Sequence, residues 1–177
     1  MTVTADGRAL TTGLTADLRI PRDPAAPDHR WPGQWPGRSA LELAALDTAP
    51  GCARAHARAV LQQWKTASAA ADDALMVVSE LVTNAVTSTR KHHSAAPVRL
   101  WLLGDGTSVL ILVWDATMPP PVPAPAPAPR DAEHGRGLTL VAGLAAQWDW
   151  YYPAGPPGGK VVWALMPPPG ARQRAAR

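Results

Sequence analysis

Two polar residues near the middle of the chain have the types and the spacing that acid–base and metal chemistry need. Glu80 precedes Asn84 by four residues, so a helix would place both side chains on one face, one turn apart. A glutamate can act as a general base for a hydroxyl or a water. The carbonyl oxygen of an asparagine is a hard ligand suited to Mg²⁺. Taken alone, the pair fits equally an ordinary helix with a solvated polar face.

The segment that carries this pair, residues 72–89, has the apolar period of an amphipathic helix. At 3.6 residues per turn, one face collects apolar side chains, while Glu80, Asn84 and Thr87 fall on the opposite face. The residues predicted for the buried face are Leu75, Val78, Val82, Ala85, Val86 and Thr89. The pattern therefore predicts a core helix that holds the polar pair on its far side.

A buried strand that ends in a carboxylate is predicted further along the chain. Residues 98–114 contain two β-rich runs joined by G-D-G-T, and the Asp-Gly step is typical of a hairpin turn. The second run is apolar on both faces, which predicts a central strand, and Asp115 follows it. Because an unpaired buried charge is costly, we expect this carboxylate to have a role. Capping of a loop is the simpler alternative to a role in ligand binding.

Two glycines open a second candidate helix, predicted over residues 138–146. Gly135 and Gly137 flank Arg136. Glycine lets the backbone approach a phosphate, and a helix N-terminus supplies amide donors and a positive dipole. Arg136 would then face a phosphate or pair with an acid at the surface. Such a short glycine pattern is weak evidence until other motifs accompany it.

These stretches occur in the order found in one ATPase superfamily. Residues 79–86 (S-E-L-V-T-N-A-V) resemble the N-box of the gyrase, heat-shock chaperone and histidine-kinase ATPases, and more closely that of bacterial anti-sigma-factor serine/threonine kinases. Residues 113–117 (V-W-D-A-T) are similar to the adenine-binding Asp box, and residues 134–141 (H-G-R-G-L-T-L-V) to the glycine box. Residues 159–165 match the usual closing strand, so the resemblance covers about residues 39–166.

The resemblance implies a Bergerat-type ATP-binding fold. This fold is a two-layer α/β sandwich, in which helices pack on one face of a mixed, mostly antiparallel sheet. The implied layout is a flexible Pro/Gly-rich segment over residues 1–38, the ATP-binding domain over 39–166 and a basic tail over 167–177. Residues 39–46 have helix propensity, but the resemblance places an edge strand there. A proline-rich stretch at 117–133 takes the place of the ATP lid. A polyproline II conformation would make this stretch a semi-rigid spacer. The alternative is that a proline-binding partner recognises it.

The resemblance also implies ATP and Mg²⁺ as cofactors and assigns roles to individual side chains. Asn84 would hold Mg²⁺ on the phosphates, and Asp115 would accept a hydrogen bond from the adenine amino group. Glu80 would be the general base for transfer of the γ-phosphate to a Ser or Thr of an antagonist protein. The glycine box would contact the nucleotide through Gly135, Arg136 and Gly137.

Three departures from the family pattern bear on ATP binding and turnover rather than on the fold. Ala116 and Thr117 follow the Asp box in place of the usual glycines, Ser88 stands where a basic residue or histidine is common, and prolines replace the lid. Two other function classes therefore stay open. One is a nucleotide-binding regulatory module with little or no kinase activity, and the other is an interaction protein that has lost ATP binding.

The composition argues against several other kinds of protein. The 177 residues include 17 Lys+Arg and 14 Asp+Glu, a net charge of +3, without the clustered basic and aromatic residues of a nucleic-acid groove. A single cysteine excludes an internal disulfide and a Cys-based zinc site. No apolar run reaches the ~18 residues of a membrane span, so we expect a cytoplasmic protein. Its expected partners are a sigma factor or an anti-sigma-factor antagonist protein, and a homodimer stays open.

Overall fold

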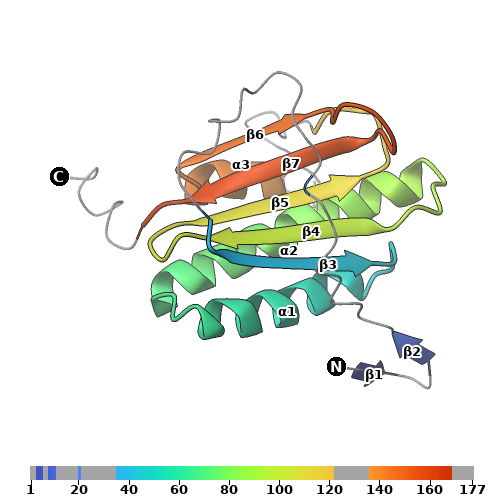
Figure 1. Cartoon of the computed structure of the whole chain (residues 1–177). Coiled ribbons are helices and arrows are strands. Elements are labelled where there is room, and N and C mark those ends of the chain that lie inside the picture. Colours follow the sequence, from blue (N-terminus) through green and yellow to red (C-terminus); the bar gives the residue numbers. More distant parts are fainter. Residues whose placement is uncertain (1–2, 6–7, 11–19, 21–34, 122–135, 169–177) are drawn as a thin grey trace.

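The computed structural model describes residues 3–5, 8–10, 20, 35–121 and 136–168 of the chain. Its main body has two layers, a five-stranded sheet and three helices that cover one face of it (Figure 1). The strands of this sheet are β3 (Gly37–Leu43), β4 (Val98–Gly104), β5 (Val109–Asp115), β6 (Gln147–Tyr151) and β7 (Lys160–Met166). The helices are α1 (Ala49–Gln63), α2 (Ser68–Lys91) and α3 (Arg136–Leu144).

Two short strands near the N-terminus, β1 (Val3–Ala5) and β2 (Arg8–Leu10), form a separate antiparallel pair. No helix within the described ranges is both long enough and apolar enough to cross a membrane.

The sheet confirms the predicted two-layer fold class. Its strand order is β3-β4-β5-β7-β6, and each of the four neighbouring pairs is antiparallel. The predicted hairpin is β4–β5, and β5 is the central strand, buried along its whole length. Residues 37–43 form the edge strand that the resemblance implied, although their local propensity favours a helix. Pairing with β4 along all seven residues overrides that local preference.

The side chains of β5 divide between two cores. Val109, Ile111 and Val113 pack with the helices, while Leu110, Leu112 and Trp114 pack on the other face of the sheet. Because successive residues of a strand alternate between faces, Asp115 follows on the helix side. The helix-free face is rich in aromatic side chains, which are Trp35, Trp101, Trp114, Tyr151 and Trp163.

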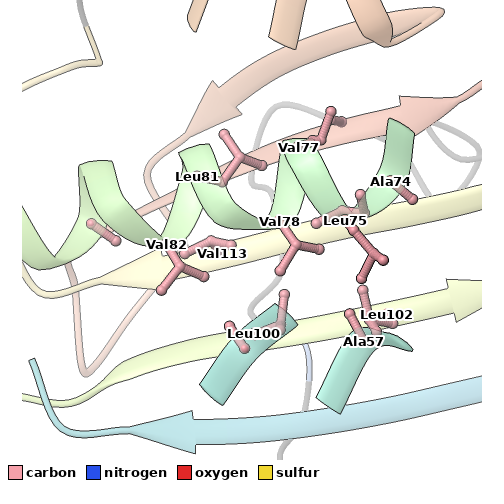
Figure 2. Packing of buried hydrophobic residues seen from close by; sticks show 14 of the residues in the cluster. Ala57, Ala74, Leu75, Val77, Val78, Leu81, Val82, Leu100, Leu102 and Val113 are labelled. Carbon is pink, nitrogen blue, oxygen red and sulfur yellow. The ribbon is translucent and has the colours of Figure 1, made fainter. Parts of the chain in front are cut away.

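Helix α2 forms the centre of the helix-side core (Figure 2). All six residues predicted for its buried face are buried, and so are Ala74, Val77 and Leu81. The buried arc is wider than predicted because α2 packs against α3 as well as against the sheet. Burial of each Val or Leu side chain contributes roughly 1.5–3 kcal/mol. The helix is also longer than the predicted residues 72–89, since it begins at Ser68 and ends at Lys91.

Two glycines make room for the indole of Trp64 at the edge of the sheet. Gly37 and Gly104 lie opposite each other in the β3–β4 pair. A Cβ atom added to Gly104 would lie 2.7 Å from Trp64 Cε3, and one added to Gly37 would lie 2.9 Å from Cε2. Real Cβ atoms do not approach other atoms so closely, so glycine at both positions lets Trp64, the first residue after α1, pack against this end of the core.

Candidate functional site

A stripe of polar side chains runs along α2 between the start of α3 and the end of β5. We call Glu80, Asn84 and Ser88 the polar stripe, because they follow one another at intervals of four residues. All three are half-buried, whereas Thr87 is exposed. The exposure of Thr87 agrees with the predicted outward face, but Ser88 was not among the residues predicted there. Ser88 is half-buried because its side of α2 packs against β5 and because its hydroxyl forms a hydrogen bond with Thr117, just after β5.

Glu80 lies against the first turn of α3. This helix begins at Arg136, two residues before the predicted start, so Gly137 belongs to its first turn. A Cβ atom at Gly137 would overlap Oε2 of Glu80 and would lie 3.3 Å from its Cδ. The carboxylate therefore occupies space that exists only because residue 137 is glycine. It also lies at the end of α3 where the helix dipole is positive.

Asn84 carries a buried polar atom without a partner. In the described part of the chain, its Nδ2 atom is inaccessible to solvent and makes no hydrogen bond. A buried unsatisfied donor costs free energy and calls for an explanation. A phosphate oxygen would satisfy this donor, and the Oδ1 atom of the same amide is the kind of oxygen that binds Mg²⁺. Among the described residues, no group of three or more His, Cys, Asp or Glu could hold a metal, so a metal here would depend on Asn84 and on oxygens of the ligand.

Asp115 belongs to a cluster of four polar side chains, the Asp115 cluster, formed with the buried Thr117 and Lys160 and the half-buried Ser88. Lys160 Nζ donates to Asp115 Oδ1 at 2.8 Å, to Thr117 Oγ1 at 2.5 Å and to Ser88 Oγ at 3.4 Å. The backbone N–H of Thr117 donates to the same Oδ1 at 2.9 Å, and its hydroxyl donates there too. Asp115 is 1% exposed and Lys160 is 4% exposed. The carboxylate is thus part of a buried ion pair with extensive hydrogen bonding.

Backbone geometry holds Lys160 in this position. Asp115 and Lys160 lie opposite each other at the ends of β5 and β7. Gly158 and Gly159 precede Lys160 with φ angles of +73° and +78°, which favour glycine. The indole N–H of Trp114 donates to the carbonyl of Gly158 at 2.7 Å, which fixes this turn onto the end of β5. The ion pair is therefore a consequence of how the two strands align.

Sequence reasoning missed the roles of Lys160 and Thr117. Lys160 was assigned only to the start of the last strand, and Thr117 only to a departure from the Asp box. The available signal was a lysine at the first position of an apolar strand, since a buried ammonium needs an acidic partner. That signal identifies Asp115 as the partner only when the alignment of β5 with β7 is known.

The remaining predicted residues are described only in part. Gly135 and residues 122–133 of the proposed lid lie outside the described residues, and only the backbone of Arg136 is described. A hollow of about 450 Å³ lies elsewhere, between residues 42–45 and 94–97, and is lined by none of the predicted site residues. We therefore locate the site from the polar stripe and from the Asp115 cluster, which meet at Ser88.

Comparison with known families identifies the domain. A family model described as the histidine kinase-like ATPase domain matches residues 43–165, which is more than half of the chain. The chain belongs to the histidine kinase-like ATPase domain family. No curated protein matches the chain. The match includes α1, α2, α3 and every predicted site residue, and membership of this ATPase family indicates an ATP-binding regulatory function.

The residues present fit a nucleotide of this ATPase family unevenly. The unpaired Nδ2 donor of Asn84 fits a phosphate group beside α2. At the other end, Asp115 offers a carboxylate for a base, but Lys160 already neutralises it. The phosphate end is therefore the better supported half of the site.

Proposed function

We propose that this chain is an ATP-dependent regulatory protein that transfers the γ-phosphoryl group of ATP to a Ser or Thr of an antagonist protein. The resemblance to anti-sigma-factor kinases suggests this reaction, and a sigma factor or its antagonist is the proposed partner. The observation that carries the proposal is the unpaired, buried amide of Asn84, one helical turn from the Glu80 carboxylate. This arrangement supplies a ligand for phosphate or metal beside a proton acceptor.

Two residues of the polar stripe, Glu80 and Asn84, have distinct roles in this proposal. Asn84 would donate to a phosphate oxygen through Nδ2 and would hold Mg²⁺ through Oδ1. Bound Mg²⁺ would neutralise charge on the phosphates. Glu80 accepts the proton of the acceptor hydroxyl as its oxygen bonds to the γ-phosphorus, and the bond from phosphorus to the bridging oxygen breaks to release ADP. Gly137 leaves the space in which the Glu80 carboxylate lies.

The test separates binding from transfer. ATP affinity is measured by calorimetry with and without Mg²⁺, and transfer of labelled γ-phosphate is measured on a panel of candidate antagonist proteins. Glu80→Gln should keep the affinity for Mg-ATP but lower the transfer rate by about 10²- to 10⁴-fold, because a general base acts mainly in the transition state. Glu42→Gln is the matched control, since Glu42 lies in β3 and pairs with Arg99 at the surface.

Other outcomes assign the chain differently. If Glu80→Gln transfers phosphate as fast as the wild type, Glu80 is not the base. If the wild type binds ATP but transfers no phosphate to any candidate, the kinase reaction falls and a nucleotide-dependent binding module stands. The buried pairing of Asp115 with Lys160 favours weak nucleotide binding, because it leaves the carboxylate proposed for adenine partly satisfied without a nucleotide. If no nucleotide binds, the chain is an interaction protein.

A further inference from the structure

We propose that Lys160 sets the nucleotide affinity of this chain by competing with the adenine amino group for Asp115. The inference rests on the proposed function, since it assumes that a nucleotide binds with its base at Asp115. It assigns a specificity-determining role to a residue outside the three boxes of the resemblance. Lys160 would hold the ligand-free site in a satisfied state that binding must partly disrupt.

The hydrogen bonds of the Asp115 cluster favour competition. A carboxylate oxygen has two lone pairs, yet Oδ1 of Asp115 receives the Lys160 ammonium and two donors of Thr117. No hydrogen bond joins Oδ2 to any described residue. An adenine amino group must therefore displace a donor from Oδ1 or bind Oδ2 of a carboxylate whose charge is already neutralised.

All N–H groups of the Lys160 ammonium already have acceptors, so none is left to bind the adenine ring. The ammonium carries three N–H groups, and these have three acceptors, one each on Asp115, Thr117 and Ser88. Lys160 therefore acts on the base indirectly, through the state of Asp115. The bond to Ser88, at 3.4 Å, is the longest of the three, so Ser88 contributes least to holding the ammonium.

Removal of the ammonium should have opposite effects on folding and on binding. Lys160→Met keeps an unbranched side chain, one atom shorter, but leaves the Asp115 carboxylate buried without its counter-ion, so the protein becomes less stable. The adenine amino group can then satisfy that carboxylate, so the complex loses less than the free protein. ATP affinity should therefore rise by about tenfold, the scale of a hydrogen bond to a charged group. A lysine with only a structural role would lower both quantities.

The experiment measures the free energy of unfolding and the binding of two triphosphates. One is ATP, and the other is purine riboside 5′-triphosphate, which lacks the amino group. Wild type, Lys160→Met, Asp115→Asn/Lys160→Met and the control Lys91→Met are compared. Lys91 is an exposed lysine in the last turn of α2. Lys160→Gln, which keeps a donor without the charge, carries the test if Lys160→Met does not fold.

The proposal is supported if Lys160→Met gains affinity for ATP but not for the purine riboside nucleotide. The double variant and Lys91→Met should show no such gain. Loss of a positive charge alone would weaken the binding of any triphosphate, so the expected gain has the opposite sign. Equal or weaker ATP binding by the folded variants, or a gain shared by both nucleotides, overturns the proposal while the proposed function stands. If neither the wild type nor any variant binds ATP, the proposed function falls and this inference falls with it.

Discussion

The carboxylate of Glu80 occupies the space that a side chain at Gly137 would need. A Cβ atom there would come inside 3.0 Å of Glu80 Oε2 and would lie 3.5 Å from its Cβ. Among the described residues, Glu80 makes no hydrogen bond or ion pair, so the backbone of α3 is what confines it. The positions of the proposed base and of the glycine box are therefore linked by a steric contact.

Gly137→Ala tests this contact. In the wild-type background it should lower the free energy of unfolding by about 1 kcal/mol, because Glu80 must adopt another rotamer. With Glu80→Ala present, the same substitution should be neutral or stabilising by up to about 1 kcal/mol, because alanine suits a helix better than glycine. Urea unfolding of the four proteins gives the coupling energy. The same effect in both backgrounds would mean that the two residues are independent.

Asn84→Ala should separate stability from ligand binding. The substitution removes a buried donor without a partner, so the free energy of unfolding should stay constant or rise by less than about 1 kcal/mol. Binding of Mg-ATP should weaken at least about tenfold, since the amide is the proposed phosphate and metal ligand. Thr87→Ala, on the exposed side of the same turn, is the control for both measurements. A fall in stability above about 1 kcal/mol would show that the amide has a structural partner.

Gly104→Ala should be among the more damaging small substitutions in the sheet. The new methyl group would meet the ring of Trp64 at 2.7 Å, and overpacking of this kind costs about 1–3 kcal/mol. Gly143→Ala, in α3, meets no atom within 4 Å and should stabilise the protein by up to about 1 kcal/mol. Thermal and urea unfolding of both variants compare the two sites. Equal effects would mean that Trp64 moves aside freely.

His56 should make the fold sensitive to mild acid. Its Nε2 atom lies 2.9 Å from Ser39 Oγ, and burial lowers the pKa of the His56 imidazole below 6.5. The unfolded chain therefore binds a proton more readily than the folded one, and stability falls as the pH drops below about 6.5. Above that range this histidine contributes no pH dependence. His56→Gln should remove this part of the profile of unfolding free energy against pH, and an unchanged profile would exclude His56 as its source.

Local patterns in the sequence were sufficient for much of the fold. The 3.6-residue period identified six of the nine buried residues of α2. The Asp-Gly turn between two apolar runs identified the β4–β5 hairpin. Both signals depend on neighbours within a few residues of one another. The start of α3 was misplaced by two residues because glycine at position 137 reads as a helix breaker, whereas here it makes room for Glu80.

The site was less predictable because its contacts join distant parts of the chain. Glu80 and Asn84 could be placed on one helix face by spacing alone. The choice of Ser88 over Thr87 as the third polar residue depends on a hydrogen bond to Thr117, 29 residues away. The partner of Asp115 lies 45 residues further on, and its identity follows only from the alignment of β5 with β7. Spacing rules carry no information about such pairs.

The ion pair between Asp115 and Lys160 also favours the observed alignment of β5 with β7. A slip of β7 by one residue would turn the ammonium toward the face that carries Trp101 and Trp163 and would leave Asp115 uncompensated. Insertions or deletions in the loop over residues 152–159 would therefore be tolerated only when they preserve the face of the sheet on which Lys160 lies. The ion pair would therefore help the chain select the correct strand alignment during folding, apart from its proposed effect on nucleotide binding.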